Sequence, residues 1–248
     1  MRRLLLAATF GLLATTVALT RGVTQQTAAV IENTAAGNLI VHPINHATLR
    51  FEFKGKQYYC DPSGRAEWPT LPKADYIFIT HEHGDHLNPM IVDIIKSSTV
   101  AVYMNASAQS KSSSTVPNAQ IIAHGEKKAV GDATVEAIPA YNLTPERLMF
   151  HPKDRNDNGY LLTFGGKRVY VAGDTEDIPE MRALKNIDLA FLPCNLPYTM
   201  DAKQCAAGAR AFKPKVLYPY HQGKTNPNEV KDALADVKEI EVRVLALP

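Results

Sequence analysis

One seven-residue stretch, Thr80–His86, constrains the fold of this chain more than any other, because it holds three histidines and two carboxylates. It follows the apolar, β-rich run 74–79, which is typical of a buried strand. It precedes Asn88 and Pro89, which can cap and begin a helix. The stretch is therefore predicted to form a strand-to-helix loop at the carboxyl end of a strand, where open α/β sheets place their functional sites.

The spacing within this loop predicts metal binding. His81 and His83 are two residues apart, so they point to one side of an extended segment and can bind one cation. Gly84 lets the backbone turn, so that Asp85 and His86 can face a second cation. Neutral imidazoles and a carboxylate suit Zn²⁺ or a similar borderline metal. A chance cluster of polar residues is the weaker interpretation, because three of the eight histidines of the chain fall within six positions.

Two further candidate ligands end apolar strands later in the chain. Asp174 follows the run 168–172, and its two carboxylate oxygens could bridge two cations; the alternative is a cap for the helix expected near residue 180. His221 ends the run 216–220 and would complete the second metal site.

Together these segments resemble the metallo-β-lactamase fold superfamily. The resemblance is carried by His81-x-His83-x-Asp85-His86, by the strand pair 159–175 that ends in Asp174, and by Tyr218-Pro219-Tyr220-His221. The branch it is most similar to is the small single-domain metal-dependent hydrolases like ascorbate-6-phosphate lactonase. The resemblance implies an α/β chain folded as a four-layer αββα sandwich, with the metals along one edge. It implies these metal ligands: His81, His83, Asp85, His86, Asp174 and His221.

The sequence departs from the superfamily pattern at one ligand. In most relatives a third histidine follows the strand that ends here at Ala140, but this chain has Tyr141-Asn142 at that place. The next histidine is His151. Either His151 swings in from the loop and takes over the ligand role, or Asn142 contributes a weak oxygen ligand and one metal site is depleted. We favour His151.

The predicted activity is metal-assisted hydrolysis. Two divalent metals about 3.5–4 Å apart would lower the pKa of a water held between them and provide a hydroxide nucleophile. Asp85 is the candidate for orienting that group or carrying its proton, and His151, if it is not a ligand, for protonating the leaving group. Zinc is the expected metal, with manganese or iron as alternatives. The expected substrate is a small organic ester, lactone or phosphodiester, bound in a cleft lined by residues 193–200.

Two other functions stay open at this point. A mononuclear iron dioxygenase could use the same histidines on the same fold. A non-catalytic protein could use the site to hold a metal or a ligand, and the altered third-histidine position favours it. Asp85 argues against it, because a mere scaffold would not need that carboxylate.

Composition narrows the partners and the compartment. The net charge is +2, with scattered Lys and Arg, so nucleic acid is not an expected partner. Cys60, Cys194 and Cys205 are odd in number and widely spaced, which favours buried free thiols over a disulfide framework. The sequence does not predict an oligomeric state.

The first part of the chain has the pattern of an export signal. A positive start and a nearly unbroken apolar run make residues 1–23 a predicted signal peptide, with an uncleaved membrane anchor as the alternative. Residues 24–37 are predicted to be a flexible lead-in, and residues 38–248 a single metallo-hydrolase domain. The mature protein is expected in the periplasm or the medium, without stable membrane insertion.

Other polar residues are predicted to be structural or solvated. His42 and His46 flank the first expected hairpin. The resemblance to the superfamily implies that His46 lies nearer the cleft, because relatives often have a histidine there at the matching position. His124 is predicted to lie on the surface, and the aspartates of the segment 154–158 in a solvated turn.

Overall fold

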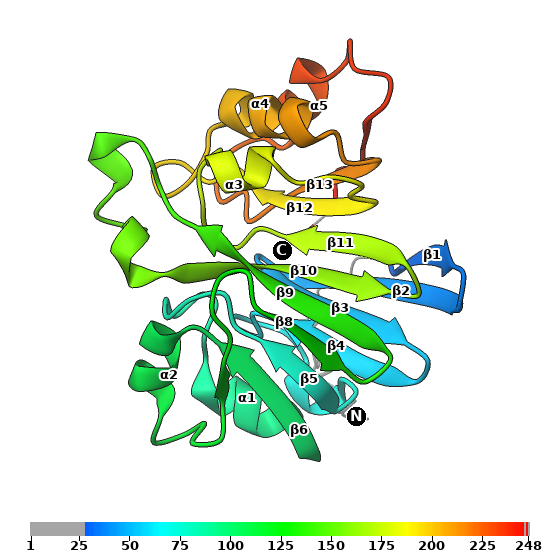
Figure 1. Cartoon of the computed structure of the whole chain (residues 1–248), viewed down its shortest axis with the longest axis vertical. Coiled ribbons are helices and arrows are strands. Elements are labelled where there is room, and N and C mark those ends of the chain that lie inside the picture. The colour runs from blue at the N-terminus through cyan, green and yellow to red at the C-terminus, as the bar shows by residue number, and fades with distance from the viewer. Residues whose placement is uncertain (1–27, 246, 248) are drawn as a thin grey trace, which may run out of the picture.

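The computed structural model describes residues 28–245 and 247, which form two seven-stranded sheets (Figure 1). The first sheet consists, in spatial order, of β1 (Val30–Thr34), β2 (Gly37–Asn45), β3 (Thr48–Phe53), β4 (Lys56–Cys60), β5 (Ala74–Phe78), β6 (Lys96–Met104) and β7 (Gln120–Ile121). The second consists of β14 (Glu241–Val242), β13 (Val216–Tyr220), β12 (Leu189–Pro193), β11 (Lys167–Val171), β10 (Asp157–Phe164), β9 (Ala133–Ala140) and β8 (Lys127–Val130).

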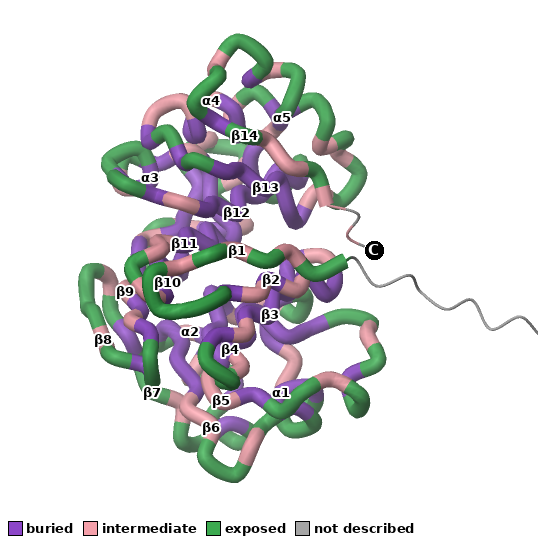
Figure 2. Tube along the Cα trace, turned by 90° about the vertical axis from the view of Figure 1, so that its right-hand side faces the viewer, coloured by how far each residue is buried: buried purple, intermediate pink, exposed green. Residues whose placement is uncertain are grey.

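Helices cover the outer face of each sheet. α1 (Pro89–Ile95) and α2 (Ala106–Ser112) pack against the first sheet, and α3 (Pro179–Arg182), α4 (Ala202–Phe212) and α5 (Asn228–Ala233) against the second (Figure 1). The main apolar core lies between the sheets, where Phe51 contacts Phe164 and Phe191 with ring centroids 5.7 and 6.1 Å apart. The most buried stretches follow the strands of both sheets (Figure 2). The predicted four-layer αββα sandwich is confirmed.

The sheet topology brings several strand ends to one edge. β4, β5 and β6 are parallel in the first sheet, and β11, β12 and β13 are parallel in the second. β9 and β11 are both antiparallel to β10, so they run in the same direction. The loops that follow β5, β9, β11 and β13 therefore meet at one edge of the sandwich, as open α/β sheets require for a functional site.

The N-terminal boundary of the fold differs from the predicted one. Val30–Thr34 is not a flexible lead-in but the strand β1, paired antiparallel with β2. Glu32 fixes it by ion pairs of 2.8 Å with Lys167 and with Arg243, which lie on and beside the second sheet. A sequence pattern cannot show such distant partners. The predicted signal peptide lies outside the described residues, and no helix within them is long and apolar enough to cross a membrane.

The three cysteines are buried and unpaired, as predicted. Burial raises the pKa of Cys194 to about 12, and it raises those of Cys60 and Cys205 as well. These thiols therefore stay protonated near neutral pH and behave as small apolar core residues.

Candidate metal centre

The loop after β5 carries four of the predicted ligands. Backbone amides of His86 and Leu87 both donate to the carbonyl of His83, at 3.0 and 2.8 Å, which closes the loop into a tight turn. The side chain of Asn88 then accepts from the first amides of α1, and Pro89 begins that helix. The predicted strand–loop–helix arrangement is confirmed.

One group of ligand atoms is built from three histidines. His81 Nε2 lies 3.1 Å from His83 Nδ1. The ring of His151 lies 5.0 Å from that of His81 and 4.9 Å from that of His83, both edge to face. The three residues each offer a ligand atom within the reach of one cation. The structure thus brings His151 from its distant loop to the place where the third histidine was missing.

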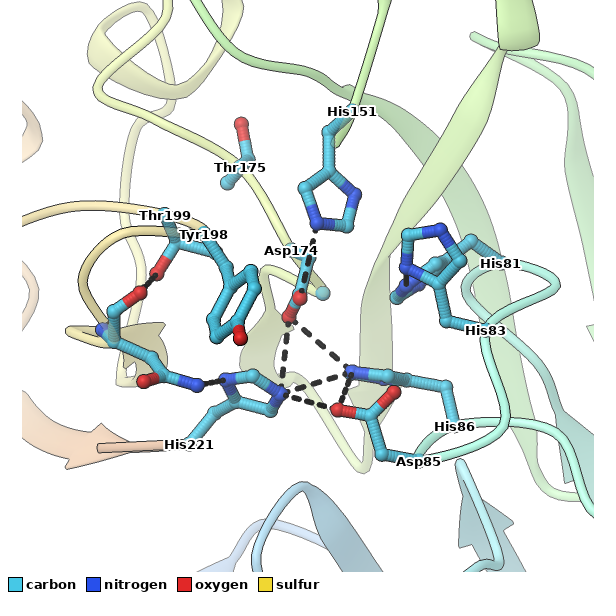
Figure 3. A network of polar contacts seen from close by, with 12 residues as sticks. His81, His83, Asp85, His86, His151, Asp174, Thr175, Tyr198, Thr199 and His221 are labelled. Carbon is cyan, nitrogen blue, oxygen red and sulfur yellow. Dashed lines mark hydrogen bonds and ion pairs between the residues drawn. The ribbon is translucent and has the colours of Figure 1, made fainter. Parts of the chain in front are cut away.

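A second group lies beside it. His86 Nε2 is 3.1 Å from His221 Nε2, and Asp85 Oδ2 is 3.3 Å from the same His221 nitrogen (Figure 3). His86 and His221 are buried, whereas the side chain of Asp85 is 49% exposed. Asp85 is therefore the most exposed member of this group toward the open cleft.

Asp174 joins the two groups. Its Oδ2 lies 3.2 Å from His151 Nε2, and its Oδ1 lies 3.3 Å from His86 Nε2 and 3.5 Å from His221 Nε2 (Figure 3). The preceding Gly173 has φ +65°, and a Cβ there would lie 2.9 Å from the Cβ of Thr80. Only glycine lets the chain pass this close to the β5 loop, which is what aims the carboxylate between the two groups.

This donor set fits a metal. Asp174 Oδ1 is buried and has no hydrogen-bond donor among the described residues. His86 Nδ1 lies 2.8 Å from Asp61 Oδ2, so Nε2 is the ring nitrogen that faces the orphan oxygen. Ring nitrogens and carboxylate oxygens gathered at such short separations form an arrangement that a cation between them would stabilise. Imidazole and carboxylate are ligands that Zn²⁺ and its neighbours prefer.

The pKa values divide the histidines into two kinds. Burial, together with the nearby His151 and Arg155, lowers the pKa of His83 to about 4. Burial and the neighbouring His86 likewise lower the pKa of His81. Burial opposes protonation at His86 too, but Asp174 and Asp61 outweigh it and raise the pKa of that residue. His81 and His83 are therefore ready to bind metal near neutral pH, whereas a metal must displace a proton at His86.

Both carboxylates remain ionised. Burial alone would raise the pKa of Asp174, but the adjacent His221 and His86 lower it well below its usual range. The same balance lowers the pKa of Asp85, through hydrogen bonds with His221 and His46. Two anionic carboxylates in a buried cluster of histidines form an attractive environment for a divalent cation.

Asn142, the alternative ligand, has a different role in this structure. Its Nδ2 donates to the carbonyls of Arg147 and Tyr198, at 2.9 and 2.7 Å, and so links two loops. The backbone N–H of Asn142 donates to the backbone carbonyl of His151 at 2.8 Å, which helps to hold His151 beside the histidine cluster. Metal binding by His151 stays a prediction, but its position favours it over Asn142.

Three residues of the site had no role there predicted from the sequence, although His46 was expected to lie near the cleft. Asp61 accepts from the amide and the hydroxyl of Thr80, both at 2.7 Å, besides contacting His86. The available signal was its position directly after β4, beside the parallel strand β5. His46 lies 3.3 Å from Asp85, and its ring centroid is 4.0 Å from that of His221.

Arg155 is the third. Its Nη1 lies 3.0 Å from His83 Nε2, and its Nη2 lies 2.9 Å from His151 Nδ1. It also forms an ion pair with Asp157, which is buried in β10. The prediction of a solvated turn here was therefore wrong for Asp157, because Arg155 compensates its charge. His124, predicted on the surface, is partly buried against the Asp157 carbonyl at 3.0 Å.

A cavity of about 630 Å³ opens onto the cluster. Metal-ligand candidates form its floor, and the predicted cleft segment contributes one wall through Asn195, Leu196, Pro197 and Tyr198. His46, Phe150, Gly223 and Lys224 complete it. Pro193, Thr199 and Met200, also expected to line the cleft, are not part of its lining; Thr199 and Met200 are fully buried.

The fold and the site define a class of protein: an αββα sandwich with histidines and aspartates gathered at one edge as candidate metal ligands. Comparison with known proteins places the chain within that class. Residues 50–222 match the family described as Beta-lactamase superfamily domain. A protein of Ligilactobacillus salivarius, named UPF0173 metal-dependent hydrolase, is 32% identical over 208 residues, covering 78% of this chain and 90% of its own.

Solved structures agree. A crystal structure from Parabacteroides distasonis, described as a metal-dependent hydrolase, has a TM-score of 0.84 and 44% identity, covering 90% of this chain and 100% of its own. A metallo hydrolase from Ignicoccus hospitalis, 22% identical, has a TM-score of 0.68 over 83% of this chain and 94% of its own, and shows the fold alone. The chain belongs to the metallo-β-lactamase superfamily, and within it to the family of metal-dependent hydrolases that the Ligilactobacillus protein represents.

Proposed function

We propose that this chain hydrolyses an ester, lactone or phosphodiester bond of a small organic substrate, using two divalent cations, with zinc ahead of manganese and iron. One observation carries the proposal: each carboxylate oxygen of Asp174 faces a different group of histidines. His81, His83 and His151 would hold one cation, and Asp85, His86 and His221 the other. When bound, such a pair of cations would lower the pKa of a bound water toward neutrality and polarise the oxygen of the scissile bond.

The residues of the chain supply position and proton transfer. Asp174 fixes the spacing of the two groups because it touches both. Asp85 is held by His46 and His221, each 3.3 Å from its Oδ2, and its exposed side chain reaches the cleft. It can therefore orient the attacking water and accept its proton. Hydrolysis adds one water across the bond, which gives an acid and an alcohol from an ester or a phosphodiester and one hydroxy acid from a lactone, so no further reactant is needed.

The half-open cavity supports a small organic substrate. A volume of about 630 Å³ is in the range of small-molecule pockets. The floor is polar, and Lys224 and His46 are further polar side chains that line the cavity. The chain's low net charge of +2 offers no broad electrostatic footprint for nucleic acid.

The experiment is a panel of esters, lactones and phosphodiesters, assayed with the full-length chain loaded with zinc, manganese or iron. We expect turnover of at least one class with zinc or manganese, abolished in His81→Ala. Turnover that requires iron and consumes oxygen would replace hydrolysis with oxygenation. Metal binding without turnover of any class would leave a binding protein.

We also propose export, on the sequence pattern of residues 1–23. The expected result is a processed chain in the periplasm or medium, with its new N-terminus found by sequencing near residue 20. An unprocessed chain in the cytosol would contradict export without touching the metal site.

A further inference from the structure

Two loops next to the metal centre expose an unusual amount of apolar surface. They are the β9–β10 loop, residues 141–156, and the β12–α4 loop, residues 194–201. Among the described residues, five of the ten large apolar side chains that are clearly exposed lie on these loops: Leu143, Leu148, Met149, Leu196 and Tyr198. Both loops project at the same end of the second sheet (Figure 1). Clustered apolar exposure of this kind marks binding surfaces, whereas scattered exposure does not.

The two loops form one rigid frame. Asn142 ties them together through the carbonyls of Arg147 and Tyr198. Arg147 donates to Glu176 and, at 3.0 Å, to the carbonyl of Thr199. Glu176 also accepts from the β9–β10 loop, and its side chain is 1% exposed. The apolar side chains are therefore held exposed by a buried polar network, not left exposed by a loose loop.

The apolar surface continues into the reaction cleft. Phe150, Leu196, Pro197 and Tyr198 line the same cavity as Asp85, Asp174 and His221. The ring of Phe150 packs edge to face on Tyr198, with centroids 5.0 Å apart. Figure 3 shows Tyr198 on the same side as His221, facing the ligand cluster. A substrate bound with its scissile bond at Asp174 must place a neighbouring group against this wall.

We propose that Phe150, Leu196, Pro197 and Tyr198 form a subsite for an aliphatic chain, so that the substrate is an amphiphilic ester or lactone with a medium-length acyl chain. This inference rests on the proposed function and names its substrate class. The polar floor takes the ester group, and the wall removes the chain from water. Each methylene placed against such a wall tightens binding by roughly two- to fourfold.

The test is a binding series that needs no turnover. Linear carboxylates from butanoate to decanoate are titrated calorimetrically into the zinc-loaded full-length protein. We expect the Kd to fall roughly two- to fourfold per methylene up to the length of the wall. Leu196→Ser and Tyr198→Ser should flatten this slope. Ile121→Ser is the matched control, because Ile121 is 48% exposed, close to Leu196 at 44%, but lies on β7, away from the cavity lining.

The outcomes separate the subsite from the function. A slope that Leu196→Ser flattens, with no hydrolysis of any ester, supports the subsite and overturns the hydrolase. Hydrolysis of short and long esters at equal kcat/KM, with a flat binding series, overturns the subsite and leaves the hydrolase intact. A slope that neither Leu196→Ser nor Tyr198→Ser changes also overturns the subsite. Binding to neutral phosphatidylcholine vesicles that Met149→Ser abolishes, while the carboxylate series stays flat, overturns it too and indicates a membrane surface instead.

Discussion

The two sheets build the metal centre in different ways. The first sheet contributes four candidate ligands from one short loop, residues 81–86, closed by its own backbone hydrogen bonds. The second contributes His151, Asp174 and His221 from three separate loops, together with the apolar wall of the cleft. Four of the candidate ligands are thus concentrated in a compact local motif, whereas the spacing of the candidate ligands and the shape of the cleft depend on the packing of the second sheet. Variants on either side should therefore fail differently.

The largest effect is expected where the two contributions meet. Asp174→Asn removes the bridging charge, so activity should fall by roughly 10³-fold or more, equivalent to several kcal/mol of lost transition-state stabilisation. Metal content should fall in parallel. Asp188→Asn is the control, because Asp188 lies beside the second sheet and pairs with the exposed Lys215. Equal losses in the two variants would show a general effect on the second sheet, and not a bridge.

The next effect concerns the stability of the rigid frame formed by the β9–β10 and β12–α4 loops, which depends on one buried ion pair. Arg147→Met leaves Glu176 buried without its cation, which we expect to cost about 3 kcal/mol of unfolding free energy. Denaturant unfolding measures this. Arg210→Met breaks the pair with Asp236, which is exposed and screened by water, and should leave the free energy of unfolding nearly unchanged. A similar small cost for both would mean that the loops are not held by this pair.

A smaller effect is expected behind the first-sheet loop. Asp61→Asn removes the charge that orients His86, so zinc affinity should fall about 10- to 100-fold while the three-histidine group keeps its ligands. Competition with a chelating dye measures it, and Asp75→Asn, at the Lys56 ion pair, is the control. Unchanged affinity in Asp61→Asn would remove Asp61 from the metal centre.

The smallest effect concerns the first sheet away from the metal. Burial, followed by the charge of Arg50, lowers the pKa of His42 from 6.5 to about 4. The unfolded chain therefore binds a proton at His42 more tightly than the folded chain does. The contribution of neutral His42 to the free energy of unfolding is complete above pH 6.5 and is lost as the pH falls toward 4. Between pH 7 and 4.5 the wild type should lose about 1–2 kcal/mol more unfolding free energy than His42→Gln. Parallel curves would refute the shift.

The same contrast explains what could be predicted from the sequence. The first-sheet loop was readable because its ligands are adjacent in the chain and follow an apolar strand. Asp174 and His221 were readable because each ends an apolar strand. Asp61 and Arg155 could not be predicted, because their partners lie on other segments of the chain. Asp61 contacts His86, and Arg155 contacts His83 and His151.

The fold followed the same pattern. The apolar strands and their helices were predictable from the sequence pattern, which indicates a layered α/β domain, whereas the αββα order of the layers followed from the resemblance to the superfamily. β1 was missed because its residues are largely polar and its stability comes from Glu32 reaching Lys167 and Arg243. The turn 154–158 was misjudged for a related reason: Asp157 is buried because Arg155 compensates it. A sequence pattern predicts that charged residues face solvent, because it does not show the tertiary partners that allow them to be buried.

The central claim is that His151 completes one of two metal groups joined by Asp174. Elemental analysis of the zinc-loaded full-length chain tests it most directly, with His151→Ala and, as control, His124→Ala, whose ring contacts only a backbone carbonyl in the described hydrogen bonds. We predict about two zinc ions per chain in the wild type and the control, and about one in His151→Ala. One metal per chain that His151→Ala leaves unchanged would contradict the account.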